Sequence, residues 1–218
     1  MVTEHPAWGA LLIGGPSGVG KSTVARRLAL RLGISWLMVD DLRLAMQRSR
    51  VALPEHTEAL YFFEETPDVW ALPPERLRNA LIAVGEVMSP AIEVVVENHV
   101  DQASPAVIEG DGILPSLWTL PGVRERAAAG LARGVFVVEP DEGTILANFR
   151  SRGRYEEGRT EEGLHSDARA KWLYGQWLAG EARRYGLPVI NPRPWDTLPD
   201  RILTAVREPA GGWPLGAR

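Results

Sequence analysis

The segment from Gly9 to Gly33 constrains the fold more than any other part of the chain. It opens with an apolar run, Ala10 to Ile13, which has the composition of a buried strand. The octet GPSGVGKS follows at residues 15–22, and apolar residues then recur at helical spacing as far as Leu32. Gly33 is typical of the position that ends a helix. A strand, a glycine-rich turn and a helix in this order predict a phosphate-binding loop.

The residue types of this octet suit a bound triphosphate and match G-x-x-x-x-G-K-[ST] at every fixed position. The glycines expose backbone N–H groups, and the helix that begins near Lys21 directs its positive end at the phosphates. Lys21 supplies a compact charge for the β and γ oxygens, and Ser22 offers a hydroxyl to Mg²⁺. A glycine turn that fits the pattern by chance is the alternative, and the flanking strand and helix argue against it. The residues expected to contact the nucleotide, which we take to be ATP, are Gly15, Ser17, Gly18, Val19, Gly20, Lys21, Ser22 and Thr23.

The use of lysine supports this interpretation. The chain has 24 lysines and arginines together, and the lysines among them are Lys21 and Lys171. Arginine cannot simply replace the loop lysine, because its planar guanidinium is bulkier than an ammonium group. Genomic base composition is the simpler explanation of the arginine excess elsewhere in the chain.

Composition and charge exclude several classes of function. A net charge of −4 argues against a general electrostatic attraction to nucleic acid. The absence of cysteine excludes disulfides, thiolate metal sites and cysteine catalysis. The first residues lack the pattern of a secretory signal, and no apolar run approaches the length of a membrane span. We therefore expect a cytoplasmic protein, monomeric or homodimeric, without nucleic-acid or membrane partners.

Strand and helix patterns alternate along the chain, which predicts an α/β fold with a parallel sheet covered on both faces. Pro90 is expected to end or kink the first of two helical patterns in the middle of the chain. The further expected strands are 34–39, 106–109, 134–138 and 189–190. The expected helices are 41–47, 57–64, 74–88, 91–101, 122–132, 141–150, 167–185 and 198–206.

Charged residues follow several of the expected strands. Asp40, Asp41 and Arg43 follow the second, and Glu109 and Asp111 follow the third. Ligands of parallel α/β sheets bind beyond the carboxyl ends of the strands, so these side chains are candidates for a binding site. The simpler alternatives are helix N-capping by Asp40 or Asp41, and solvated acids in a glycine turn.

The motifs together resemble the P-loop kinases of small metabolites, the nucleoside-monophosphate-kinase-like group. The segments GGPSGVGKST and VIEGDGILP are most similar to those of 2-phosphoglycerate kinases, although Gly110-Asp111-Gly112 departs from the expected pattern. The resemblance implies a P-loop NTPase three-layer sandwich whose five-stranded parallel sheet has the order 2-3-1-4-5. It also implies that Asp40 orients or deprotonates an acceptor hydroxyl, or holds Mg²⁺ through water, and that Arg43 binds an acidic part of the acceptor. Glu109 or Asp111 would be the metal-associated or base carboxylate.

The same resemblance places a lid and an adenine loop. Arg150, Arg152 and Arg154 fall where arginines of the group close over the transferring phosphoryl, and Arg159 extends the series. A solvated basic helix end is the alternative. Pro192 lies in the loop that corresponds to the adenine site, so Arg150 and Pro192 are further candidates for nucleotide contacts. We expect one domain over 1–208, with an acceptor-binding insertion at 50–105, a lid at 150–165 and a flexible tail at 209–218.

These features predict an ATP- and Mg²⁺-dependent phosphotransferase. The expected catalytic residues are Lys21, Asp40, Arg43, Glu109, Asp111, Arg150 and Arg154, with Ser22 and Asp40 at the metal. The acceptor would be a small hydroxyl- or phosphate-bearing metabolite, such as a 2-phosphoglycerate-like acid or a nucleotide. Two alternatives remain open: a toxin- or resistance-type kinase of a nucleotide sugar or antibiotic, and a nucleotide-dependent switch that regulates a protein partner. The sequence lacks an NKxD-like run for guanine specificity, and the arginines of the expected lid suit phosphoryl transfer better than a timed switch.

Overall fold

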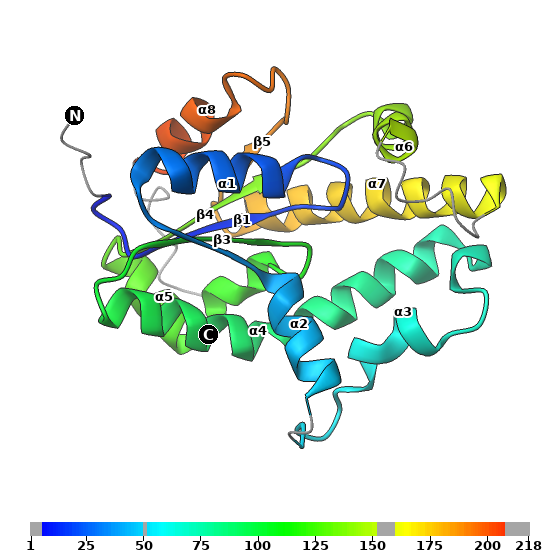
Figure 1. Cartoon of the computed structure of the whole chain (residues 1–218), viewed down its shortest axis with the longest axis horizontal. Helices are drawn as coiled ribbons and strands as arrows, with labels where there is room; N and C mark the ends of the chain where they lie inside the picture. Colours follow the sequence, from blue (N-terminus) through cyan, green and yellow to red (C-terminus); the bar gives the residue numbers. More distant parts are fainter. Residues whose placement is uncertain (1–5, 50–51, 152–159, 208–218) are drawn as a thin grey trace.

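Five parallel strands form one sheet in the order β2-β3-β1-β4-β5 in the computed structural model, which describes residues 6–49, 52–151 and 160–207 (Figure 1). The predicted α/β fold and its strand order are therefore confirmed. The strands are β1 (Ala10–Gly14), β2 (Ser35–Met38), β3 (Ala106–Gly110), β4 (Ala132–Val137) and β5 (Val189–Ile190).

The register of the sheet brings three strand ends together. Gly14, at the end of β1, pairs with Gly110 at the end of β3, and Glu109 pairs with both Ile13 and Met38. The loop that follows β1 therefore lies beside the residues that follow β3 and β2. The parallel arrangement converts three separate sequence segments into one rim.

Alternate residues of the strands build the two layers of the core. Leu11 and Ile13 of β1 pack with α1 (Lys21–Leu32) and α8 (Leu198–Ala205) on one face. Ala10 and Leu12 contribute to the larger core on the other face, which α4 (Pro74–Asp101), α5 (Pro121–Ala128) and α7 (Glu161–Arg184) cover. Figure 1 shows the sheet between these helical layers. The remaining elements are α2 (Val39–Arg48), η1 (Glu58–Tyr61), α3 (Phe62–Glu65), η2 (Val69–Ala71), η3 (Pro115–Thr119) and α6 (Glu142–Ser151).

Helix α4 continues through Pro90, so the prediction of two helices there is wrong. Its buried residues Met88, Ile92 and Val96 continue one apolar stripe across the proline, and packing of that stripe on the core outweighs the lost backbone hydrogen bond. By length and composition alone α4 could cross a membrane, with a mean hydropathy of 1.5 in its most apolar window. In the structure it packs against α5 and α7 as a core helix.

Two helix starts also differ from the prediction. Helix α2 begins at Val39, directly after β2, so Asp40 and Asp41 lie in its first turn and Asp41 is not its N-cap. Negative charge is still favourable there, because both acids lie in the first turn, near the positive end of the helix dipole. Helix α7 begins at Glu161 rather than Asp167, because the Thr160 hydroxyl accepts a hydrogen bond from the Gly163 N–H at 3.1 Å and caps it.

Candidate nucleotide and acceptor site

The loop between β1 and α1 has the backbone geometry that its glycines predict. Gly15 has a φ of 143°, and a Cβ atom there would lie 2.2 Å from the Val137 carbonyl oxygen. Gly20 has a φ of 83°, and a Cβ there would meet the indole ring of Trp195 at 2.2 Å. The glycines are therefore required by packing within the protein as well as by phosphate approach.

Lys21 is buried inside this loop, with 5% of its side chain exposed. Its ammonium donates a hydrogen bond of 2.9 Å to the Pro16 carbonyl and one of 2.7 Å to Oδ1 of Asp111. The first bond holds the lysine across the loop, and the second joins the loop to the segment that follows β3. The charge of Lys21 is thus fixed at the point where the phosphates are predicted to lie.

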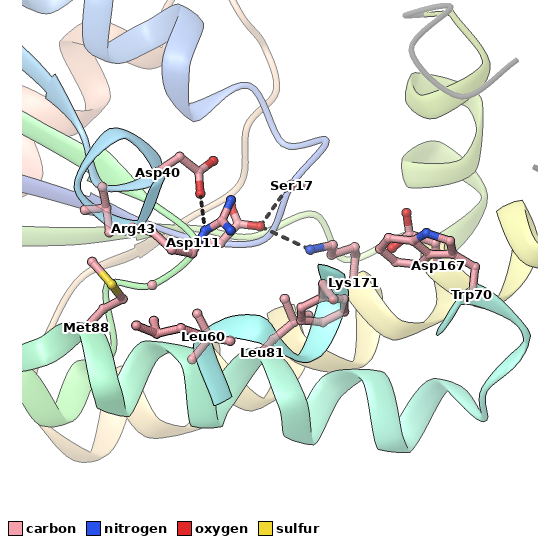
Figure 2. Close-up of a pocket in the computed structure, with 14 residues that line it drawn as sticks. Ser17, Asp40, Arg43, Leu60, Trp70, Leu81, Met88, Asp111, Asp167 and Lys171 are labelled. Atoms are coloured by element: carbon pink, nitrogen blue, oxygen red, sulfur yellow. Dashed lines mark hydrogen bonds and ion pairs between the residues drawn. The ribbon is translucent and has the colours of Figure 1, made fainter. Parts of the chain in front are cut away.

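Asp111 is the centre of the polar network. Besides the contact with Lys21, its Oδ2 accepts a hydrogen bond of 2.7 Å from the Ser17 hydroxyl and one of 3.2 Å from Lys171 Nζ (Figure 2). The Tyr174 hydroxyl donates to its main-chain carbonyl. Burial alone would raise the pKa of Asp111, but the two lysines and the hydrogen bonds from Lys21 and Ser17 outweigh it and hold the pKa well below its usual range. Asp111 is therefore ionised at neutral pH.

Glu109 lies in a different environment two residues earlier. It is 4% exposed at the end of β3, and burial raises its pKa. The charge of Lys21 and a side-chain hydrogen bond with Ser22 lower the pKa in part, while the neighbouring charges of Asp111 and Asp40 raise it further. The pKa of Glu109 is thus raised and that of Asp111 is lowered, although the two acids lie on one short segment. Opposite shifts of this kind are common where acids have distinct roles.

The side-chain oxygens of Ser22 and Glu109 fit a magnesium ion. Hydroxyl and carboxylate oxygens are ligands that Mg²⁺ accepts, and Ser22 and Glu109 already contact each other beside Lys21. Within the described residues, no three histidine or acidic side chains converge on one point suited to a metal. A magnesium ion here would therefore take much of its coordination from phosphates and water, as it does at many phosphate sites.

A cavity of about 270 Å³ opens beside Asp111. One side is polar and includes Ser17, Asp40, Arg43, Asp111 and Lys171, as Figure 2 shows. The other side is apolar, so a ligand would be held by directed polar contacts at one end and by packing at the other. The remaining lining residues are Val39, Leu60, Phe63, Trp70, Leu81, Val84, Met88, Gly112 and Asp167.

Helix α2 supplies Asp40 and Arg43 to this cavity. The Arg43 side chain is 25% exposed, and its Nε lies 3.4 Å from Oδ1 of Asp40. It also donates a hydrogen bond of 2.9 Å to Gln47, whose amide in turn donates to the Leu60 carbonyl. The guanidinium is thus oriented toward the cavity by its own helix and by the η1 segment.

A second cavity, of about 230 Å³, borders the phosphate-binding loop and shares no lining residue with the first. It is lined by Gly18, Gly20, Thr23, Asn148 and Trp195, among others. Asn148 donates a hydrogen bond of 3.0 Å to the Gly18 carbonyl. Pro192 is buried, and its carbonyl accepts a hydrogen bond from Arg201, so this proline supports the loop while Trp195 lines the cavity.

Half of the predicted lid, the segment 152–159 with Arg152, Arg154 and Arg159, lies outside the described residues. Arg150, at the end of α6, is described and half exposed. Its guanidinium forms an ion pair with Glu161 and contacts His165, and it lines neither cavity. In this arrangement Arg150 joins α6 to α7, and its role at the phosphates stays a prediction.

The contribution of α7 to the site was not predicted from the sequence. Lys171 and Tyr174 both contact Asp111, and Asp167 lines the cavity one turn earlier on the helix. Helical residues at this spacing resemble any buried stripe, so no local motif marks them. The scarcity of lysine was the one available signal, because both lysines of the chain meet at Asp111.

Comparisons with known proteins agree with this geometry. The family model described as AAA domain matches residues 11–89. Over 206 residues the chain is 30% identical to a 2-phosphoglycerate kinase of Methanothermobacter thermautotrophicus, covering 90% of this chain and 64% of that protein. It is 28% identical over 192 residues to a 2-phosphoglycerate kinase of Pyrococcus furiosus, covering 83% of this chain and 58% of that protein.

Among solved structures, a gluconokinase from Sinorhizobium meliloti 1021 is similar with a TM-score of 0.48 and 18% identity, over 91% of each chain. The chain spans about three fifths of the length of the curated relatives it matches. The resemblance that the loop and the third strand predicted extends over most of the chain and is confirmed. Residues 11–89 match the family described as AAA domain, and over most of its length the chain is similar in sequence to 2-phosphoglycerate kinases.

Proposed function

We propose that this protein is an ATP- and Mg²⁺-dependent kinase that transfers the γ-phosphoryl group to a small hydroxyl-bearing acid of the 2-phosphoglycerate type. One observation carries the proposal. Asp111 lines the cavity of about 270 Å³, which we call the acceptor cavity, and it accepts hydrogen bonds from Ser17 and Lys21 of the phosphate-binding loop. A phosphoryl group at the loop would therefore lie next to a molecule in the cavity. The names of the curated relatives support this choice of acceptor.

Each residue has a role that its position supports. Lys21 and the loop N–H groups bind the triphosphate, and Arg43 binds an anionic group of the acceptor from the polar side of the cavity. Asp111, ionised and fixed by its partners, accepts a hydrogen bond from the acceptor hydroxyl and orients it for in-line attack. Asp40, at the same rim, is a second candidate for this role. Phosphoryl transfer of this kind depends mainly on placement and electrostatics.

Magnesium would be held by Ser22, with Glu109 and Asp40 reached through water. When bound, the ion neutralises charge on the phosphate oxygens. The base of the nucleotide would occupy the second cavity, where Trp195 offers an aromatic surface. The acceptor cavity, which is small and apolar on one side, favours a compact acid over a nucleotide acceptor.

Thermal stabilisation tests this proposal. The protein is heated with ATP·Mg²⁺ and with a panel of phosphorylated acids, sugars, nucleosides, nucleotides and antibiotics, singly and together. We expect ATP to raise Tm and 2-phosphoglycerate or a similar acid to raise it further, because a ligand that binds the folded state stabilises it. The Lys21→Ala variant should lose the ATP shift.

Three outcomes would oppose the proposal. An unchanged Tm with ATP would mean that the loop does not bind the nucleotide. An ATP shift to which no acceptor adds would favour a nucleotide-dependent switch, and a shift with an antibiotic or a nucleotide sugar would favour the resistance- or toxin-type kinases.

A further inference from the structure

The two lysines of the chain contact the same carboxylate. Lys21 Nζ lies 2.7 Å from Oδ1 of Asp111, and Lys171 Nζ lies 3.2 Å from Oδ2. The chain has 218 residues and otherwise carries its side-chain positive charge on arginine and histidine. Lys21 belongs to the phosphate-binding loop, whereas Lys171 comes from the middle of α7, 60 positions beyond Asp111. One carboxylate is thus shared between a loop lysine and a helix lysine.

Helix α7 also holds the main chain of Asp111. The Tyr174 hydroxyl donates a hydrogen bond to the Asp111 carbonyl, and the Tyr174 side chain is fully buried. Residues 171 and 174 lie nearly one turn apart and therefore project from the same face of the helix. The Lys171 side chain is only 9% exposed, so its ammonium is confined to the cavity wall. Helix α7 therefore contacts both the carboxylate and the carbonyl of Asp111.

A bound triphosphate would change the balance of charge around Asp111. The phosphate oxygens would compete with Asp111 for the Lys21 ammonium, and they would place several negative charges close to the carboxylate. Repulsion between like charges in a partly buried site is weakly screened, so Asp111 then needs another cation to remain in place. Lys171 already lies at hydrogen-bonding distance.

We propose that Lys171 is a positioning residue that holds and neutralises Asp111 when the phosphates of the nucleotide engage Lys21. The proposal rests on the proposed function, because it requires a triphosphate at Lys21. Lys171 then acts through Asp111: it lowers the cost of bringing phosphates beside a carboxylate, and it keeps that carboxylate in the wall of the first cavity, next to the phosphate-binding loop.

The affinity for ATP·Mg²⁺, measured by calorimetric titration without any acceptor, tests this role. In Lys171→Met, Asp111 keeps Lys21 but loses its second ammonium, so it retains Lys21 more strongly and repels the phosphates. We expect the Kd for ATP to rise about tenfold, the size of one charge-assisted hydrogen bond. Lys171→Arg should recover most of the affinity, because it retains the charge.

A double-mutant cycle separates this role from a structural one. In the Asp111→Asn background the amide carries no charge, so Lys171→Met should change the Kd for ATP little. Arg184→Met is the matched control: it removes a positive charge from the last turn of α7, where Arg184 is 77% exposed and pairs with Glu181. This control should bind ATP like the wild type. Lys171→Gln replaces Lys171→Met in the cycle if the latter does not fold.

Two results would overturn the proposal: wild-type ATP affinity in Lys171→Met, or the same loss with and without the Asp111 carboxylate. In either case the wild type would still bind ATP, and the proposed function would stand. If the wild type itself binds no ATP, the proposed function fails and this proposal fails with it.

Discussion

Ser17 of the phosphate-binding loop donates a hydrogen bond of 2.7 Å to Oδ2 of Asp111, which lies 94 positions further along the chain. Both residues line the acceptor cavity. In the proposed mechanism, the bond therefore joins the loop that would bind phosphate to the wall that would face the acceptor. The Ser17 hydroxyl is uncharged, so its removal can affect transfer with little change in the charge that the nucleotide meets.

Ser17→Ala should lower kcat about tenfold with little effect on ATP affinity. The substitution removes one hydrogen bond to an ionised carboxylate, and Lys21 and the loop N–H groups remain. Steady-state kinetics and ATP titration measure the two effects separately. An unchanged kcat would show that the Ser17–Asp111 bond has no part in transfer.

Arg43→Met should raise the KM for the acceptor tenfold or more and leave the KM for ATP nearly unchanged. The guanidinium lines the acceptor cavity, and an ion pair with a partly buried anionic group has about this strength. Arg48→Met, a substitution on the same helix at a side chain that is 70% exposed, is the control and should behave like the wild type. An equal increase in both KM values would place Arg43 at the nucleotide instead.

Glu109→Gln should stabilise the metal-free protein at neutral pH while lowering activity. Burial raises the pKa of Glu109 in the folded state above its ordinary value of 4.5, so the folded state binds the proton more tightly than the unfolded state does. Stability contributed by this group is complete below pH 4.5 and is lost as the pH rises through the folded-state pKa. At pH 7 the ionised carboxylate of Glu109 therefore lowers the free energy of unfolding.

Thermal melts in EDTA from pH 4 to pH 8 check this expectation. The variant should melt higher than the wild type at pH 7, by about 2–4 °C for each kcal/mol relieved, and the difference should vanish toward pH 4. A lower Tm for the variant at pH 7 would contradict the assigned direction of the pKa shift.

Gly15→Ala should destabilise the fold by about 2 kcal/mol or more and abolish nucleotide binding. The new Cβ would collide with the Val137 carbonyl at a φ of 143°, a conformation that an L side chain rarely adopts. Gly180→Ala is the control, because Gly180 lies within α7 and a Cβ there would meet no atom within 4 Å outside the backbone of the helix itself. It should stabilise the protein by about 0.5–1 kcal/mol in urea unfolding. Equal stability of the two variants would contradict the account of the loop.

The sheet and the loop were predictable because their signals are local. The strand, turn and helix from Ala10 to Leu32 are contiguous, and the carboxylates after Met38 and Ile108 fall at strand ends that a parallel sheet brings together. Pro90 was misjudged because a local helix-breaking signal competes with an apolar stripe whose packing partners are distant in sequence. The Thr160 cap, followed by two glutamates, was a readable signal for the earlier start of α7.

The residues of the candidate site that follow the strands were predictable from the sequence, whereas those contributed by α7 were not. Lys21, Asp111 and Arg43 were named because motifs or strand ends mark them. Lys171 and Tyr174 reach Asp111 only through the packing of α7 on the sheet, which no spacing rule encodes. The division of the chain into a kinase-like domain, an acceptor-binding insertion and a lid stays a prediction.

The most direct test of the central claim is the rate of ADP formation from ATP·Mg²⁺ with and without 2-phosphoglycerate, together with detection of the phosphorylated acid. We predict that the acceptor raises the rate manyfold, that product forms in equal amount to ADP, and that Asp111→Asn suppresses both. ATP turnover at the same rate with and without every acceptor, and no phosphorylated product, would contradict the assignment of this protein as a small-molecule kinase.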